Sequence, residues 1–365
     1  MKIAQVAPLY ESVPPKLYGG TERVVYFLTE ELTKLGHDVS LFASGDSKTS
    51  ATLFAQVPEA LRLKEVCEDM LAPHIVQIEE VLERAKEFDL IHFHTDYLHF
   101  PSSKNLKTPH LTTLHGKLTI PELQALYFKF PEQPLVSISD NQRIPLAQAN
   151  FIATVHHGLP ENLFKPGKGE GGYFAFLGRI SAEKRCDRAI EIAIATGTPI
   201  KIAAKIDKAD RDYFEEKIKH LFEHPLVNFI GEINETQKEE FLGNAKALLF
   251  PIDWYEPFGI VLIESMACGT PVIAWNMGSV PEIIDDGKSG FIVNNMEEAM
   301  TSVHRLSFID RKIVRDCFEK RFTARRMADD YLKVYDSLIV DRRLENKETI
   351  PIKIVTDIKN VKEVS

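Results

Sequence analysis

Two carboxylates beside an apolar run near residue 260 are the residues of this sequence best suited to chemistry. Glu256 stands directly before Pro257, and Glu264 follows eight positions after Glu256. Pro257 suits the first turn of a helix, because its missing N–H costs nothing there and its φ is already helical. A helix from this point would place Glu264 about 10 Å beyond Glu256 along the axis. Because the amino end of a helix attracts anions, the pattern predicts a diphosphate between the two carboxylates.

A nucleotide sugar would fit this arrangement, with hexose hydroxyls at Glu256 and ribose hydroxyls at Glu264. Gly259 would let such a ligand approach the backbone at the start of the helix. An ordinary amphipathic helix with a capping acid would explain the two carboxylates alone. It would not explain the turn residues on either side, Pro257-Phe258-Gly259 before the run and Gly269-Thr270-Pro271 after it.

Composition narrows the class of protein. A chain of 365 residues is long enough for two domains. Its net charge of −9 argues against nucleic acid as a main partner. The four cysteines are far apart in the sequence, which is typical of a reduced cytoplasmic protein without a zinc cage or disulfide framework. The first residues resemble a strand rather than a signal peptide, and no apolar run reaches membrane-spanning length, so we expect no integral membrane association.

Apolar runs typical of strands alternate with helical patterns along the whole chain, which predicts an α/β fold with parallel sheets. In the first half we expect helices at 21–36 and 75–88, and strands near 2–7, 38–43, 89–94, 109–114, 134–138 and 151–155. A Gly- and Pro-rich linker at 158–172 separates this half from a second series. There we expect strands near 173–177, 199–204, 226–230, 246–250, 271–274 and 290–293. Helices are expected near 183–196, 208–223, 235–243, 257–267, 279–285 and 295–306.

These patterns divide the chain into two Rossmann-like, doubly wound domains, residues 1–165 and 170–322. A helix at about 323–340 is expected to pack back on the first domain. The tail, 341–365, contains Ile350-Pro351-Ile352-Lys353-Ile354-Val355, which suits either an edge strand or a mobile end. Ligands bind at the carboxyl ends of the strands in such sheets, so two facing domains would enclose a cleft.

The sequence as a whole resembles the family-4 retaining glycosyltransferases, which have the two-domain GT-B architecture. The resemblance covers about residues 1–340 and is carried by Glu256-Pro257-Phe258-Gly259 with Glu264, by Gly269-Thr270-Pro271-Val272 and by Gly278-Ser279-Val280-Pro281-Glu282. It implies that Glu256 contacts hydroxyls of the donor sugar and that Glu264 contacts the nucleotide ribose. It also implies donor binding by Pro257, Phe258 and Gly259.

Two further motifs agree with this resemblance. Gly19 and Gly20 lie between the first strand and the first helix, where glycines allow a phosphate to approach closely. A Gly-Gly turn alone is more often structural than ligand-binding. Because it differs from the G-x-G-x-x-G pattern, it also argues against a nicotinamide-dependent enzyme. Arg179 and Lys184 stand at a strand end and a helix start, spaced to reach one anion. The resemblance implies that this pair holds the donor diphosphate.

Histidine and hydroxyl residues of the first half supply further candidates. His115 follows a strand, and the resemblance implies an electrostatic and positional role near the reacting carbon of the donor sugar. Ser139 suits a helix N-cap, whereas the resemblance implies that Ser139 and Arg143 line the acceptor or phosphate side. His92 and His94 alternate so that both point to one face of a strand. We favour a structural or acceptor-lining role for them over a metal site, because no third ligand stands at a suitable spacing.

The sequence therefore predicts a retaining, metal-independent hexosyltransferase with His115, Arg179, Lys184 and Glu256 as its catalytic group. Its co-substrate is expected to be a nucleotide sugar, with UDP favoured over GDP and ADP, and no cofactor is expected. The acceptor is expected to be small and soluble, because the first half lacks a basic amphipathic helix. Alternatives are a sugar-nucleotide epimerase, a phosphorylase of similar architecture, and a non-catalytic sugar-nucleotide-binding protein. A periplasmic-type binding protein is disfavoured by the absence of a signal-peptide pattern.

Overall fold

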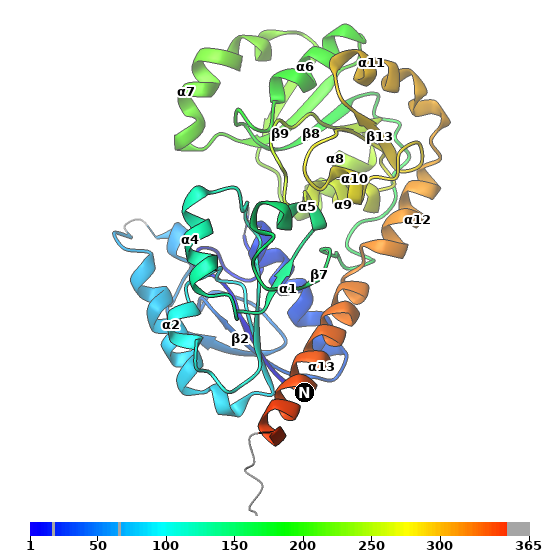
Figure 1. The fold of residues 1–365 in the computed structure, drawn as a ribbon. Helices are drawn as coiled ribbons and strands as arrows, with labels where there is room; N and C mark the ends of the chain where they lie inside the picture. The colour runs from blue at the N-terminus through cyan, green and yellow to red at the C-terminus, as the bar shows by residue number, and fades with distance from the viewer. Residues whose placement is uncertain (17–18, 65–66, 349–365) are drawn as a thin grey trace, which may run out of the picture.

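Two parallel β-sheets, each packed against helices, organise the chain into two α/β units (Figure 1). The computed structural model describes residues 1–16, 19–64 and 67–348. The first unit is blue to cyan-green in Figure 1 and the second is green to yellow, and the connection between them follows β7. No helix in these ranges is both long and apolar enough to cross a membrane.

The first sheet has seven strands in the order β3-β2-β1-β4-β5-β6-β7, all parallel. Sequence order reverses between β1 and β4, so a crevice forms beyond the carboxyl ends of these two strands. The strands are β1 (Lys2–Val6), β2 (Asp38–Ala43), β3 (Thr52–Ala55), β4 (Leu90–Phe93), β5 (His110–Thr113), β6 (Leu135–Ser137) and β7 (Phe151–Thr154).

The second sheet has six parallel strands in the order β10-β9-β8-β11-β12-β13. Its reversal lies between β8 and β11, directly beside the segment that carries Glu256. The strands are β8 (Phe174–Arg179), β9 (Ile200–Lys205), β10 (Val227–Gly231), β11 (Ala247–Phe250), β12 (Val272–Trp275) and β13 (Gly290–Val293). The central strands are buried on both faces, which explains their continuous apolar runs.

Helices connect the strands and cover the sheets. Side chains cap several of them: Ser139 caps α5, the Asn234–Gln237 capping box begins α8, and Asn295 caps α11. The α-helices are α1 (Gly20–Lys34), α2 (Leu71–Glu83), α3 (Phe100–Ser103), α4 (Pro121–Lys129), α5 (Asp140–Arg143), α6 (Cys186–Ala195), α7 (Arg211–Tyr213), α8 (Glu235–Gly243), α9 (Ile260–Ala267), α10 (Val280–Ile283), α11 (Met296–Arg305), α12 (Arg311–Arg321) and α13 (Ala324–Glu348).

The last two helices run from the second unit to the first (Figure 1). Helix α12 packs against α9, and α13 then packs against α1 of the first unit. Helix α13 buries Met327, Ala328, Tyr331 and Tyr335. The predicted helix at 323–340 is therefore present and extends to Glu348, whereas Ile350–Val355 lies outside the described residues.

Three local features differ from the sequence-based expectations. Strand β3 was not expected, because it is a short edge strand whose residues are only partly buried. The expected helix at 208–223 is divided into a 3₁₀ turn, the short α7, a π-helical turn (Phe214–Ile218) and a second 3₁₀ segment (Lys219–Glu223). Helix α12 was not expected either, and it follows the 3₁₀ turn Leu306–Phe308.

Candidate active site

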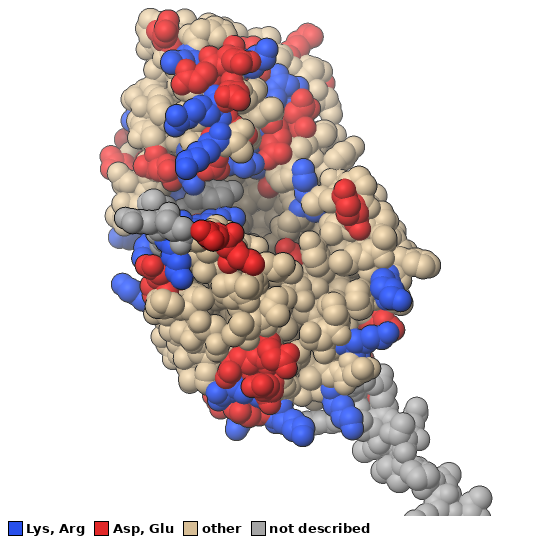
Figure 2. Space-filling model, turned by 90° about the vertical axis from the view of Figure 1, so that its left-hand side faces the viewer, with Lys and Arg blue, Asp and Glu red and all other residues tan. Residues whose placement is uncertain are grey.

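A cavity of about 510 Å³ lies between the two units and is lined by residues of both. Figure 2 shows the molecule hollowed where the units meet. In the first unit, lining residues come from the loops after β1, β4 and β5 and from the start of α1. In the second unit, lining residues come from β8, β9, β11 and the start of α9. The cavity thus lies at the carboxyl ends of the central strands of both sheets, as expected for facing doubly wound units.

The segment Glu256–Gly259 enters the cavity as a loop and not as a helical turn. Gly259 has φ +81°, so it ends the loop in the left-handed region, and α9 begins at Ile260. The prediction that Pro257 occupies the first helical turn is therefore wrong, and the axial separation of the two carboxylates no longer follows from it. Only Glu264 lies within the helix. The loop places Glu256, Pro257, Phe258 and Gly259 along the cavity wall, as predicted for ligand-contacting residues.

Gly278 and Ser279 brace this loop from behind. The Ser279 amide donates to the Glu256 carbonyl at 3.0 Å, and its hydroxyl donates to the Phe258 carbonyl at 2.7 Å. A Cβ on Gly278, whose φ is +58°, would lie 2.3 Å from the Glu256 nitrogen. The motif that follows β12 therefore fixes the position of Glu256 through direct backbone packing.

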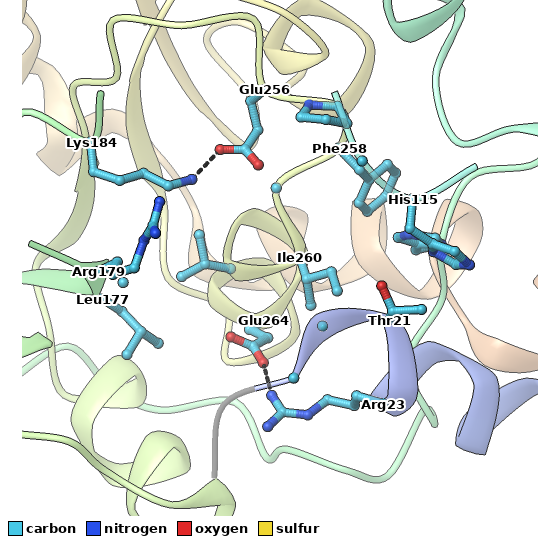
Figure 3. Close-up of a pocket in the computed structure, with 18 of the residues that line it drawn as sticks. Thr21, Arg23, His115, Leu177, Arg179, Lys184, Glu256, Phe258, Ile260 and Glu264 are labelled. Atoms are coloured by element: carbon cyan, nitrogen blue, oxygen red, sulfur yellow. Dashed lines mark hydrogen bonds and ion pairs between the residues drawn. The ribbon is translucent and has the colours of Figure 1, made fainter. Parts of the chain in front are cut away.

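Two cations reach the cavity beside Glu256 (Figure 3). Lys184 forms an ion pair with Glu256, and its ammonium lies 4.9 Å from the centre of the Trp254 ring. Arg179 donates to Glu183 at 2.7 Å and lies 3.6 Å from Asp210. Both cations lie beside carboxylates, with which an entering anion must exchange, but the buried Nε of Arg179 has no hydrogen-bond partner among the described residues.

Glu264 lies at the other end of the cavity wall, with only 3% of its side chain exposed. It accepts from Arg23 at 3.0 Å and from Lys238 at 2.7 Å, as Figure 3 shows for Arg23. Burial raises the pKa of Glu264, but Lys238 and Arg23 outweigh burial and hold it below its ordinary value. Arg23 belongs to α1, so this contact also joins the two units, and it extends to Glu235 at 3.1 Å.

The amino ends of two helices, α1 and α9, both line the cavity. Gly19 precedes α1, and a Cβ at Gly20 would lie 3.4 Å from Ile260, the first residue of α9. Gly19 also packs closely, since a Cβ there would lie 2.7 Å from Pro15. No side chain caps either helix among the described residues. The N–H groups at both helix starts therefore provide positive potential toward one space.

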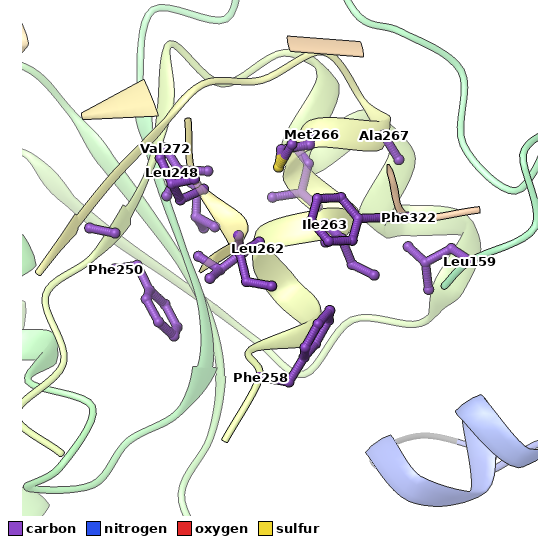
Figure 4. Packing of buried hydrophobic residues seen from close by; sticks show 14 of the residues in the cluster. Leu159, Leu248, Phe250, Phe258, Leu262, Ile263, Met266, Ala267, Val272 and Phe322 are labelled. Atoms are coloured by element: carbon purple, nitrogen blue, oxygen red, sulfur yellow. The ribbon is translucent and has the colours of Figure 1, made fainter. Parts of the chain in front are cut away.

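Helix α9 is held in place by apolar side chains that pack into the core on the sides away from the cavity (Figure 4). Leu262, Ile263 and Met266 are fully buried in the largest hydrophobic cluster. Each such side chain contributes about 1.5–3 kcal/mol when buried. Phe258 adds a T-shaped contact to Phe322, with ring centres 6.2 Å apart. The start of α9 is thus part of the core and does not shift easily.

His115 lies in the cavity wall among other histidines. Its Nε2 is 2.9 Å from Nδ1 of His94, and its ring stacks on His157 with centres 5.3 Å apart. Burial lowers the pKa of His115 to about 3, so the ring is neutral at physiological pH. His92 lies in β4 and His94 directly follows it, and their ring centres are 4.0 Å apart, so the two rings do lie together as predicted. The described residues contain no group of three side chains placed to hold a metal ion.

Ser139 and Arg143, predicted on the acceptor side, do not line this cavity. Ser139 caps α5, accepting from the Gln142 amide at 3.1 Å, and donates to the Pro257 carbonyl at 2.6 Å. Arg143 donates to Thr154 at 3.2 Å. Ser139 is therefore both the N-cap suggested by its position and a link between the units. Glu282 makes a similar link by accepting from the amides of Asp140 and Asn141, each at 2.7 Å.

The structure adds lining residues that the sequence analysis missed. Glu22 is buried, and burial raises its pKa to about 7. Asp96 lines the first unit with φ +49°, a left-handed conformation uncommon outside glycine. Tyr10, Arg62 and Lys117 also line this side. Glu22 adjoins the Gly-Gly turn and Lys117 follows His115 by two residues, so proximity to those motifs was the available signal. No sequence motif near Tyr10 or Arg62 indicated that they line the cavity.

Comparisons with known proteins indicate the family of this chain. The family described as "Glycosyl transferases group 1" matches residues 160–314, and "Glycosyltransferase Family 4" matches residues 18–190. Together they span both units. The chain belongs to the family-4 glycosyltransferases.

Two relatives of this family-4 glycosyltransferase each cover 80% of it at low identity. It is 23% identical to alpha-maltose-1-phosphate synthase of Mycolicibacterium smegmatis, over 80% of this chain and 84% of the relative. It is 24% identical to phosphatidyl-myo-inositol mannosyltransferase of the same organism, over 80% and 81%. Glycosyltransferase AviGT4 of avilamycin A biosynthesis has a similar structure, with a TM-score of 0.71 at 22% identity, covering 93% of this chain and 98% of that one.

A second solved structure is Anabaena HepE in complex with UDP and glucose. Its TM-score is 0.71 at 17% identity, and the match covers 92% of this chain and 100% of that one. The two parallel-sheet units and these structural neighbours establish the GT-B fold that the sequence predicted.

Proposed function

We propose that this glycosyltransferase moves a glucose-type hexose from a UDP-sugar to a hydroxyl of a small soluble acceptor, with retention of the anomeric configuration. The observation that carries the proposal is that two helix starts, the cations Lys184 and Arg179, and the carboxylates Glu256 and Glu264 all line one cavity. Helix N–H groups and two cations suit a diphosphate, and carboxylates suit the hydroxyls of a sugar and a ribose. A nucleotide sugar carries all of these groups in one molecule.

Charge stabilisation of the leaving diphosphate is the main catalytic effect in this proposal. When the donor enters, Lys184 exchanges its ion pair with Glu256 for the diphosphate, and Glu256 is released to accept from sugar hydroxyls. Arg179 and the start of α9 stabilise the charge that develops as the glycosidic bond breaks. Because these protein groups supply the positive charge, we propose that no metal ion is needed.

Retention follows from the direction of attack. Glu256 orients the sugar so that the anomeric carbon faces the acceptor, which is a positioning effect. The acceptor hydroxyl attacks on the face that the diphosphate leaves, and a departing phosphate oxygen takes its proton. Tyr10, Arg62, Asp96 and Lys117 make the acceptor side polar, which supports a polar acceptor. Closure of the units would exclude water and limit donor hydrolysis.

UDP is the proposed nucleotide because the structural neighbour HepE has been solved with UDP and with UDP-glucose. ADP is the competing choice, since starch synthase IV of Arabidopsis thaliana, another structural neighbour, was solved bound to ADP. The base would lie near Glu232 and Ile233, which line the cavity beyond β10.

Product analysis tests the proposal. The protein is incubated with UDP-glucose, GDP-mannose or ADP-glucose and a panel of sugars and sugar phosphates, and each product is analysed by NMR. We expect free UDP together with a glycoside of unchanged anomeric configuration. An intact but altered nucleotide sugar would indicate an epimerase instead. Tight donor binding without turnover on any acceptor would indicate a non-catalytic binding protein.

A further inference from the structure

A continuous chain of buried hydrogen bonds connects His115 in the cavity to the C-terminal helix α13. Nε2 of His94 lies 2.8 Å from the side-chain oxygen of Gln5, and Nδ1 of His94 lies 2.9 Å from Nε2 of His115. The side-chain nitrogen of Gln5 donates to the Tyr335 hydroxyl at 3.2 Å. Gln5, His94 and Tyr335 are at most 2% exposed. The side chains therefore hold one another without competing water.

The direction of donation along this chain determines the tautomer of each imidazole. Because the Gln5 oxygen can only accept, His94 carries its proton on Nε2 and leaves Nδ1 as an acceptor. His115 must then carry its proton on Nε2 to donate to His94. Its Nδ1 is left with a lone pair and no proton.

The other branch of the chain is consistent with this direction. Since the Tyr335 oxygen accepts from Gln5, its O–H is free to donate to Nδ1 of His92 at 2.8 Å. His92 then donates from Nε2 to the Thr113 hydroxyl at 2.7 Å. Burial lowers the pKa of His92 and His94 well below the ordinary value. The rings are therefore neutral, and each nitrogen has one defined role.

Nδ1 of His115 is the end of the chain, and it is buried without a hydrogen-bond partner among the described residues. An unpaired buried acceptor is costly, so a partner is expected when the site is occupied. His115 lines the cavity, and a ligand there can supply a hydroxyl donor.

We propose that Gln5 and Tyr335 are positioning residues that act through His94 to hold His115 in the Nε2-protonated tautomer. Nδ1 of His115 then accepts a hydrogen bond from a hydroxyl of the bound donor sugar. This last part rests on the proposed function. Helix α13 follows the second unit in sequence and packs on the first, so its docking determines the tautomer of a residue in the cavity between them.

Nitrogen-15 NMR of histidine-labelled protein tests the proposal, because long-range correlations distinguish protonated from unprotonated ring nitrogens. We expect wild-type His115 to carry its proton on Nε2 alone. In Tyr335→Phe the Gln5 amide loses the partner that orients it, so both tautomers of His115 should become populated. Tyr331→Phe is the matched control. It also removes a buried hydroxyl from α13, but that hydroxyl pairs with Thr113, at 2.8 Å, and not with Gln5.

A kinetic measurement connects the tautomer to the sugar. In the wild type, a deoxy analogue of the donor that lacks the contacted hydroxyl should lose about tenfold in kcat/KM, the effect of one neutral hydrogen bond. In Tyr335→Phe only about half of the protein would hold the competent tautomer, so the same deoxygenation should cost about fivefold, whereas in Tyr331→Phe it should cost as much as in the wild type.

Three results would overturn parts of the proposal. A proton on Nδ1 of wild-type His115, in protein that binds UDP-glucose, would refute the relay and leave the proposed function intact. Equal changes in the two tyrosine variants would refute the role of Gln5 orientation. A fixed Nε2–H tautomer in folded protein that binds no nucleotide sugar would refute the sugar contact and the proposed function with it.

Discussion

Gly278→Ala should disable the site without direct contact with any ligand. Gly278 has φ +58°, where a non-glycine residue costs about 1–2 kcal/mol. Its new Cβ would lie 2.3 Å from the nitrogen and 2.5 Å from the oxygen of Glu256, and ordinary contacts begin at 3.4 Å. Both neighbours are backbone atoms of a braced loop, so Glu256 must move by about 1 Å.

A displacement of that size is expected to reduce catalysis strongly. Misplacing a positioning group by about 1 Å costs about 10²-fold in rate, equivalent to about 2.7 kcal/mol of transition-state stabilisation. The assay is kcat/KM for UDP-glucose with an acceptor that gives turnover, together with thermal unfolding of each protein.

Gly287→Ala is the matched control for this variant. Gly287 also has positive φ, at +74°, but a Cβ there would have no atom within 4 Å. It should therefore lose only conformational stability and keep its kcat/KM. Wild-type kcat/KM in Gly278→Ala, or equal losses in the two variants, would refute the argument that Gly278 positions Glu256.

Three further predictions test other contacts. Arg23→Ala should lower the free energy of unfolding by about 2 kcal/mol in urea titrations, because the buried Glu264 loses a charged donor. Lys312→Ala, whose side chain is 78% exposed, should have little effect, and equal losses would contradict this reasoning. Folded Glu22 keeps its proton up to about pH 7 while the unfolded chain releases it near pH 4.5, so stability should fall as pH rises through that window. Glu22→Gln should abolish roughly 3 kcal/mol of this decrease in the free energy of unfolding. An unchanged dependence of stability on pH in the variant would contradict the assignment to Glu22. Glu256→Gln should weaken the binding of UDP-glucose about tenfold relative to the binding of UDP, as measured by calorimetry, because the sugar loses a charged acceptor. An unchanged ratio of the two affinities would place the sugar elsewhere.

Much of the fold was readable because strands and helices leave local patterns. The buried runs that became β11 and β12 are continuous and apolar, and the caps of α5 and α11 are short polar signals. Strand β3 left no such pattern, because an edge strand needs only partial burial. The start of α9 was misplaced because Pro257 favours a helical first turn, while the left-handed Gly259 prevents the helix from beginning there.

The candidate site was only partly readable. Glu256, Glu264 and the Gly-Gly turn lie in recognisable motifs, so they could be predicted as site residues from the sequence. Arg23 meets Glu264 across 241 positions, and Gln5 meets Tyr335 across 330. Such contacts depend on how two units and a returning helix pack, and residue spacing does not encode that packing.

The ion pair between Lys184 and Glu256 makes the central claim directly testable. The measurement is calorimetric titration of UDP, GDP and ADP into the wild type and into Lys184→Ala, without added metal. We predict that UDP binds most tightly and that Lys184→Ala weakens it about tenfold, the loss expected for one charge-assisted contact. Failure of the folded wild-type protein to bind any of the three nucleotides would contradict the donor site, and the proposed function with it.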